Sequence, residues 1–156
     1  MTKIGIISDT HGRIPARALE ALRGVDRILH AGDIGDPDLL AELEAVAPVT
    51  AVHGNMDGPE LRDTVPAEAV IETDGRTIVL MHGDALRDQS VATFRAARPE
   101  ADMVVHGHTH RVRVERDELP WVVNPGSAGD PRKGDPPTVA IVRIEDGEME
   151  VDIVAL

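Results

Sequence analysis

Side chains that bind metal ions recur along this chain, and most of them come directly after short apolar runs. They fall into six groups: Asp9-Thr10-His11, Gly32-Asp33, Gly54-Asn55-Met56-Asp57, His82-Gly83, Gly107-His108-Thr109-His110 and Asn124-Pro125-Gly126-Ser127. Their donor atoms are carboxylate and amide oxygens together with imidazole nitrogens, a mixture that favours Mn, Fe, Zn or Ni over Ca or Mg. Because the chain has no cysteine, a thiolate site is excluded. The groups predict a site for first-row transition metals.

The spacing inside two of these groups predicts which side chains lie together. In an extended segment, residues two apart project to the same side. We therefore expect Asp9 beside His11, and His108 beside His110. The small residues next to them would let the backbone approach an ion or a substrate closely.

The segments between the groups alternate between strand and helix patterns. Strands are expected at residues 4–7, 27–30, 49–52, 69–72, 77–81, 103–105, 112–116, 121–123, 138–144 and 150–154, and those from residue 112 onward are expected to be antiparallel. Helices are expected after Pro15, around Leu39 to Val46 and at residues 88–98, and the dipeptide Asp74-Gly75 predicts a hairpin. This alternation predicts α/β layering with two sheets and flanking helices. Since no segment resembles a linker, one domain is expected over residues 1–156.

Composition narrows the class of protein further. The formal net charge of −12 opposes binding to duplex nucleic acid through a basic surface. An acidic protein that acts on anionic substrates needs a local source of positive charge, which bound metal ions would supply. No stretch approaches ~18 consecutive apolar residues, so no membrane span is expected. The N-terminus does not read as a signal peptide and cysteine is absent, so a cytoplasmic protein is expected, and a homo-oligomer remains open.

The order of the six groups resembles the calcineurin-like metallophosphoesterases, in particular the compact YfcE-type phosphodiesterases. The resemblance runs from Ser8 to Ser127, which is most of the chain. Each group alone is a weak signal, whereas all six in this order, with Gly-His-Thr-His among them, are highly specific. The resemblance implies a four-layer αββα sandwich with two mixed sheets. It also implies hydrolysis of a small or exposed phosphate ester, with a phosphodiester favoured.

The resemblance further implies two divalent ions, Mn foremost and Fe, Ni or Zn as alternatives. The implied ligands of the first ion are Asp9, His11, Asp33 and His110, and those of the second are Asp33, Asn55, His82 and His108. Asp33 would bridge the ions, and a hydroxide held between them would attack phosphorus. Asp33, Asn55 and His108 are the residues expected to take part directly in catalysis.

Residues around Asn55 depart from the pattern of larger relatives. Where those relatives carry Gly-Asn-His-Glu, Met56 and Asp57 follow Asn55 here, so a possible proton donor is missing. His53 stands where a basic residue often precedes Gly-Asn. Two roles are open for it, a substrate contact and a plain loop residue. Asp57 is expected chiefly as a turn or capping group.

The remaining polar residues receive supporting roles or none. Asn124 and Ser127 are expected to order the loop beneath the site by hydrogen bonds. His30 and His106 adjoin apolar runs and are expected to be core or supporting groups. The acidic side chains expected on the solvated surface are Glu42, Glu44, Glu68 and Glu72. Asp84, two residues after His82, has no assigned role.

A second class of function competes with the enzyme. A related subunit of the retromer keeps this fold as a non-catalytic protein-interaction scaffold. The two hypotheses differ in whether the set of metal ligands is complete, and all seven ligand residues are present in this sequence. The sequence therefore favours the enzyme.

Overall fold

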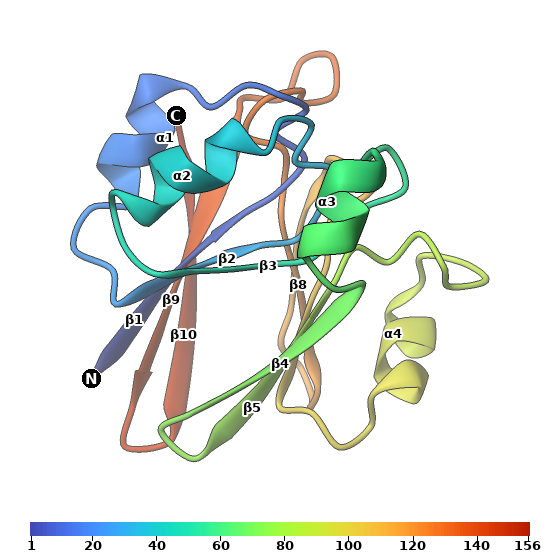
Figure 1. The fold of residues 1–156 in the computed structure, drawn as a ribbon. Coiled ribbons are helices and arrows are strands. Elements are labelled where there is room, and N and C mark those ends of the chain that lie inside the picture. Colours follow the sequence, from blue (N-terminus) through green and yellow to red (C-terminus); the bar gives the residue numbers. More distant parts are fainter.

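Two sheets packed face to face form the centre of the molecule, and helices cover their outer faces (Figure 1). The computed structural model describes residues 1–156. The first sheet has the order β10-β9-β1-β2-β3, and its strands are β1 (Thr2–Ile7), β2 (Arg27–His30), β3 (Val49–Ala51), β9 (Thr138–Glu145) and β10 (Glu148–Ala155). The second has the order β4-β5-β6-β8-β7, with β4 (Glu68–Thr73), β5 (Arg76–Met81), β6 (Met103–Val105), β7 (Val112–Glu115) and β8 (Trp121–Pro125). The helices are α1 (Ala16–Ala21), α2 (Asp38–Glu44), α3 (Pro59–Thr64) and α4 (Val91–Ala97).

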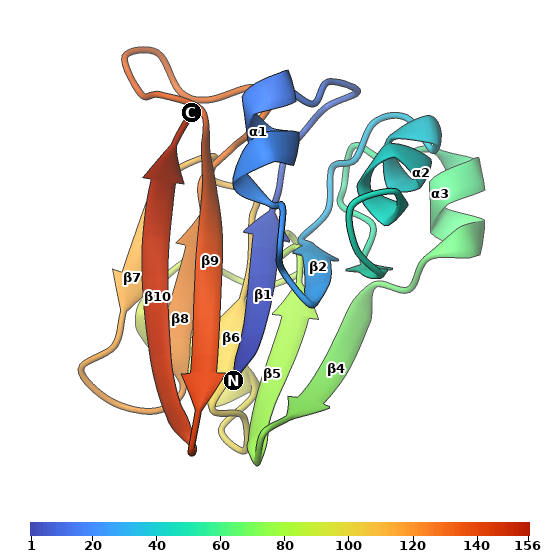
Figure 2. The same cartoon turned by 90° about the vertical axis from the view of Figure 1, so that its left-hand side faces the viewer.

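The central strands β1, β2, β5, β6 and β8 are short and largely apolar because both of their faces are buried. In β1, Ile4 and Ile6 point into the core between the sheets, whereas Ile7 packs beneath α1. In β5, Leu80 faces the same central core and Val79 packs against α4. Figure 2 shows α1 lying over the outer face of the first sheet. The expected pair of mixed sheets with flanking helices is confirmed.

Strand direction brings the polar groups to one end of the molecule. β1, β2 and β3 run parallel, and so do β5, β6 and β8. Ligand sites of layered α/β proteins form at the carboxyl ends of such strands. Five of the six groups found in the sequence begin one to three residues after one of these strands, and the sixth begins at the last two residues of β8.

Three elements differ from the sequence-based expectation. Helix α3 was not expected, because Leu61 is its one buried residue and leaves no apolar stripe. Helix α4 begins after Ser90 rather than at Asp88, because the Ser90 side chain accepts a hydrogen bond from the Thr93 backbone N–H and caps the helix. The later strands, expected to be antiparallel, divide between the two sheets, and β8 pairs parallel with β6. No helix is long and apolar enough to cross a membrane.

Candidate metal centre

The candidate ligands from both sheets meet in one cluster. Asp9 Oδ1 lies 3.3 Å from His110 Nε2 and 3.8 Å from His11 Nε2. Donor atoms of Asp9, His11, Asp33 and His110 all lie within 4.8 Å of one another. These are the four residues that the resemblance implied for the first ion.

A second group of donors adjoins the first and shares Asp33 with it. Asp33 Oδ2 lies 3.6 Å from His11 Nε2 and 3.2 Å from His82 Nε2. Asn55 Oδ1 lies 3.0 Å from His82 Nε2 and 3.2 Å from His108 Nδ1. The Asp33 carboxylate thus lies between the two groups of donors.

Turning backbone, rather than extended strand, aims these side chains. β1 ends at Ile7, and five candidate ligands have positive φ: Asp9 at 52°, His11 at 46°, Asp33 at 54°, His108 at 76° and His110 at 62°. The expectation that extended segments pair these side chains is therefore wrong, although Asp9 and His11 do lie close together. Left-handed conformations are costly for non-glycine residues and concentrate at functional sites.

Two glycines let the loops of the cluster approach each other closely. A Cβ at Gly54 would lie 2.2 Å from Asp33 Oδ1, and one at Gly107 would lie 2.1 Å from Ser8 Oγ and 2.6 Å from Asp9 Oδ2. Any larger residue would displace one of the two carboxylates. These glycines are therefore required by space rather than by backbone conformation.

The Asp9 carboxylate is buried and only half satisfied. Its Oδ2 accepts hydrogen bonds from Ser8 Oγ and from the His108 N–H. Its Oδ1 is buried without a hydrogen bond of acceptable geometry, despite the nearby His110 nitrogen. An unsatisfied buried carboxylate oxygen is costly, and a bound cation would remove that cost. The residues present therefore fit a metal ion.

Mutual electrostatics keep the carboxylates ionised. Burial alone would raise the pKa of Asp9, but the nearby imidazoles of His11 and His110 hold that pKa well below its ordinary value. Burial would likewise raise the pKa of Asp33, but the hydrogen bond with His82 lowers it. Both groups are therefore anions at neutral pH, as metal ligands must be.

The same contacts raise the pKa of three imidazoles. The nearby Asp9 carboxylate raises the pKa of His11 and of His110. Burial would lower the pKa of His82, but its contact with Asp33 raises it.

Hydrogen bonds to backbone carbonyls orient two of the imidazoles. His82 Nδ1 lies 2.8 Å from the Ala31 carbonyl oxygen, and His110 Nδ1 contacts the Asp130 carbonyl oxygen. Since a carbonyl only accepts, each Nδ1 carries the proton and each Nε2 faces the cluster. This is the usual arrangement of metal-binding histidines.

The supporting residues make the following contacts. Asn124 Nδ2 donates to the Gly107 carbonyl and to Thr109 Oγ1, while Ser127 Oγ donates to the Asp9 carbonyl at 2.7 Å. Asp57 is buried, and its two carboxylate oxygens accept from the N–H groups of Gly35 and Gly54, which ties two ligand-bearing loops together.

His53 lies outside the cluster. It is half-buried and lines a neighbouring hollow together with His82.

Sequence reasoning missed Arg62, which holds one of the ligand loops. Arg62 of α3 donates to the carbonyls of Gly54, Asn55 and Asp57, and so secures the loop that carries Asn55. Pro59 at the first turn of α3 was the available signal for that helix. His30, expected only as a buried supporting group, accepts from the Gly32 N–H and contacts Thr10 Oγ1, so it joins the first two ligand loops.

His106 is buried and stacks on Phe94 with ring centroids 4.0 Å apart. Glu68 was expected on the solvated surface, but it is partly buried because it pairs with Arg98 from α4.

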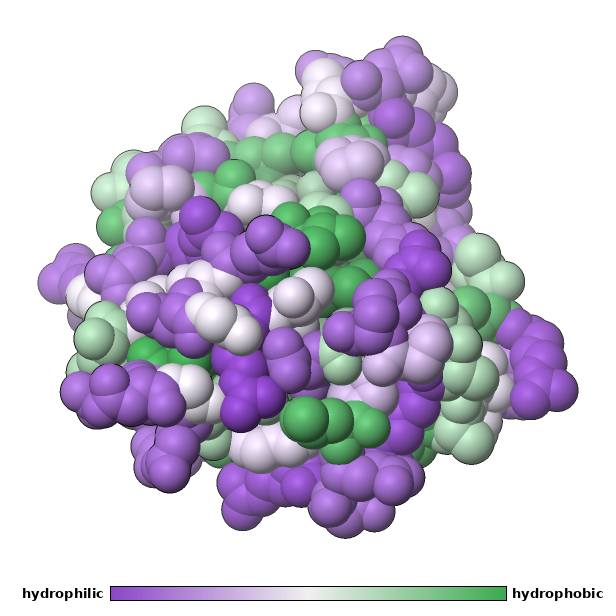
Figure 3. Space-filling model, turned by 90° about the horizontal axis from the view of Figure 1, so that it is seen from below, coloured by the Kyte–Doolittle hydropathy of each residue, from purple (hydrophilic) through white to green (hydrophobic).

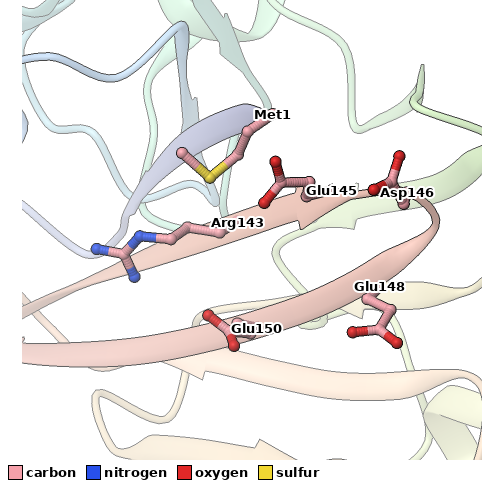
Figure 4. Close-up of a pocket in the computed structure, with 6 residues that line it drawn as sticks. All are labelled: Met1, Arg143, Glu145, Asp146, Glu148 and Glu150. Atoms are coloured by element: carbon pink, nitrogen blue, oxygen red, sulfur yellow. The ribbon is translucent and has the colours of Figure 1, made fainter.

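The opposite end of the molecule offers no comparable chemistry. A hollow of about 310 Å³ there is lined by Met1, Arg143, Glu145, Asp146, Glu148 and Glu150, around the β9–β10 turn (Figure 4). Four carboxylates against one guanidinium would repel a phosphate ester. The face seen from below is largely hydrophilic with scattered apolar residues (Figure 3). The candidate site is therefore the cluster at the carboxyl ends of the strands.

Two mixed sheets with an aspartate–histidine cluster at their strand ends define a class of α/β protein with a candidate metal centre. Within that class, the chain belongs to the calcineurin-like phosphoesterase superfamily, whose domain model matches residues 2–147.

Individual relatives agree with this membership. A probable metallophosphoesterase of Methanothermobacter thermautotrophicus is 37% identical over 97% of this chain and 91% of that protein. The phosphodiesterase YfcE of Escherichia coli K12 is 30% identical over 87% of this chain and 84% of that protein. The crystal structure of Vps29 from Chaetomium thermophilum superposes with a TM-score of 0.83 at 19% identity, covering 100% of this chain and 97% of that one. The last likeness concerns the fold alone.

Proposed function

We propose that this protein is a phosphodiesterase that holds two divalent metal ions, Mn foremost, and hydrolyses small or exposed phosphate esters. The observation that carries the proposal is the position of the Asp33 carboxylate between two groups of donors. A carboxylate shared in this way suits a pair of cations and has no evident use in a scaffold.

The donor chemistry supports a specific division of ligands. Asp9, His11, Asp33 and His110 would hold one ion, and Asp33, Asn55, His82 and His108 the other. When bound, the ions would activate a water molecule as nucleophile and neutralise charge on the phosphoryl group. The mixture of oxygen and nitrogen donors favours Mn, Fe, Zn or Ni.

The exposure of the ligands indicates how the substrate arrives. Asp9, Asp33 and His82 are buried, whereas His108 is half-buried and Asn55 is exposed. The phosphate ester would therefore reach the ions from the side of Asn55 and His108, which orient it. Met56, 69% exposed, has no proton to donate, so the chain supplies no general acid there.

Metal removal and restoration test the proposal. Protein treated with a chelator should lose its hydrolysis of bis(4-nitrophenyl) phosphate and regain it best with Mn²⁺. Metal analysis of the saturated protein should approach two ions per chain. Full activity in verified metal-free protein, or saturation at a single ion, would contradict the dinuclear mechanism.

The scaffold remains the competing hypothesis. It predicts a stable fold without hydrolysis under any metal, and the likeness to Vps29 is compatible with it because that likeness concerns only the fold. The complete ligand set and the similarity to proteins named phosphodiesterases favour the enzyme.

A further inference from the structure

A second hollow, of about 370 Å³, lies directly beside the candidate metal centre. His82 lines it with one side of its ring while its Nε2 faces Asp33 and Asn55. Its other lining residues come from the end of β5 and the segment after it, from the end of α4 and from four positions between residues 53 and 68. A phosphoryl group at the cluster would therefore place one of its ester arms in this hollow, whose volume lies within the range of small-molecule sites.

The wall of the hollow is partly apolar. Five of its twelve lining residues are hydrophobic, and they are Ala67, Met81, Ala85, Leu86 and Ala97. Such a wall suits the body of an organic alcohol rather than bulk water.

The hollow is lined by two arginines and two acidic residues, so their formal charges sum to zero, but their contacts differ. Arg98 and Glu68 pair with each other. Arg62 directs its hydrogen bonds at three backbone carbonyls. Asp84 is exposed and takes part in no hydrogen bond or ion pair, so its carboxylate is the free acceptor at the hollow.

We infer that this hollow binds the alcohol arm of the substrate, and that the arm is an uncharged, hydroxyl-bearing group of about the size of a nucleoside or a sugar. The inference rests on the proposed phosphodiesterase function and adds its substrate class. Asp84 is the specificity-determining residue, because its carboxylate accepts hydrogen bonds from hydroxyl groups and repels an arm that carries its own negative charge.

A matched pair of chromogenic esters tests the inference. The first is thymidine 5′-(4-nitrophenyl phosphate), and the second is the same compound with a 3′-phosphate. In both, water adds to phosphorus and the bond to 4-nitrophenolate breaks, so only the charge of the other arm differs. With Mn²⁺ bound, kcat/KM should be higher for the uncharged arm.

Asp84→Asn should reduce that preference by about fivefold, the factor that corresponds to two unit charges ~4 Å apart in water. Near 1 M salt the parent protein should lose most of its preference, since the Debye length falls to about 3 Å. Glu150→Gln removes one negative charge near the β9–β10 turn and should leave the preference unchanged. If Arg62 instead binds the 3′-phosphate, the parent protein will prefer the 3′-phosphorylated ester. That preference would overturn the inference. An unchanged preference in Asp84→Asn also overturns it.

Binding supplies a readout that does not depend on turnover. Thymidine added to metal-free protein should shift the backbone amide resonances of residues 83–86 and leave those of residues 145–148 in place. Shifts confined to other segments would contradict the assignment of the hollow. Activity of the parent on bis(4-nitrophenyl) phosphate separates the two proposals. If that activity is absent, the proposed function fails, whereas if it is present without arm selectivity, only this inference fails.

Discussion

Asp33 is the single side chain on which both halves of the proposed centre depend. Its Oδ2 lies near His11 on one side and His82 on the other, while its Oδ1 accepts the Met56 N–H. Asp33→Asn keeps the shape but removes the charge that holds two cations together. We expect loss of one or both ions and a fall in turnover of at least ~10³-fold.

Metal analysis and steady-state kinetics check this prediction. Asp38→Asn, the same chemical change at an exposed position in α2, should keep two ions and parental turnover. If Asp33→Asn behaves like that control, Asp33 does not bridge two metal ions.

His30 makes folding depend on pH through its burial. Burial lowers the pKa of His30 from 6.5 to about 4. As pH falls from 6.5 towards 4, the unfolded chain therefore binds a proton that the folded protein does not bind, and stability is lost. Between pH 7 and pH 5 this contribution amounts to about 2 kcal/mol.

Urea unfolding of metal-free protein at the two pH values measures the effect. The variant His30→Gln is the comparison, because its amide offers a donor and an acceptor without titrating. Groups other than His30 contribute equally to the pH dependence of stability in the parent and in this variant. The variant should therefore lose about 2 kcal/mol less than the parent over this range. Equal losses would show that His30 is not held neutral.

At the residue scale, the sequence predicted the types of the donor groups better than it predicted their geometry. Carboxylate, amide and imidazole groups after apolar runs were visible, and the structure gathers them in one cluster. The positive φ values of Asp9 and His108 were not visible, because turn conformation depends on contacts with other loops. The pairing of Glu68 with Arg98 was missed for a similar reason, since thirty residues separate the partners.

At the element scale, the cluster depends on loops that approach each other closely at a glycine, as the Gly107 loop approaches Ser8 and Asp9. A side chain at residue 107 would meet Ser8 Oγ and Asp9 Oδ2 at 2.1 and 2.6 Å. Gly107→Ala should therefore push the Asp9 carboxylate from its place and reduce metal affinity by about 10- to 100-fold. Secondary structure should persist, because neither loop belongs to a strand.

Titration calorimetry with Mn²⁺ and circular dichroism measure these two effects. Gly58→Ala is the matched control, since a Cβ there meets no atom within 4 Å. Unchanged metal affinity in Gly107→Ala would contradict the close approach of the two loops.

At the element scale, burial decided which elements the sequence could predict. Runs such as Arg27–His30 and Met103–Val105 were predicted with their observed bounds, because a strand covered on both faces is continuously apolar. Helix α3 buries only Leu61 and left no pattern. The start of α4 was misplaced because Asp88 and Ser90 are both plausible caps, and the hydrogen bond to Thr93 selects Ser90.

At the scale of the whole molecule, the proposed ligands divide between the sheets. The first sheet supplies both carboxylates, the amide and His11, whereas the second supplies His82, His108 and His110. Bound ions would therefore join the two sheets and stabilise the folded state. At 100 times the dissociation constant, one site contributes about 2.7 kcal/mol, which for a chain of this size raises the melting temperature by roughly 5–10 °C.

Differential scanning calorimetry with and without Mn²⁺ measures this shift. The shift should shrink in Asp33→Asn, which retains fewer ligands. An equal melting temperature at saturating Mn²⁺ and in chelator would contradict a centre that links the sheets.

The assignment of strands to sheets was the part of the fold that local sequence could not supply. The residues of β7 to β10 all read as strands, yet β7 and β8 join the second sheet while β9 and β10 return to the first. Such pairings depend on contacts between residues far apart along the chain, which periodicity does not encode. The pattern predicted two sheets with flanking helices, and the resemblance to a known family supplied the four-layer sandwich with mixed sheets.

The return of β9 to β1 has a consequence for synthesis on the ribosome. β1 carries Asp9 and His11 at its end, and it pairs with β2 on one side and with β9 on the other. All proposed ligands precede residue 111, but β9 begins only at Thr138. A nascent chain can therefore hold every ligand while β1 still exposes an unpaired edge, which is prone to association with other chains. The edge of β1, the strand that precedes Asp9, is thus covered only after β9 has emerged.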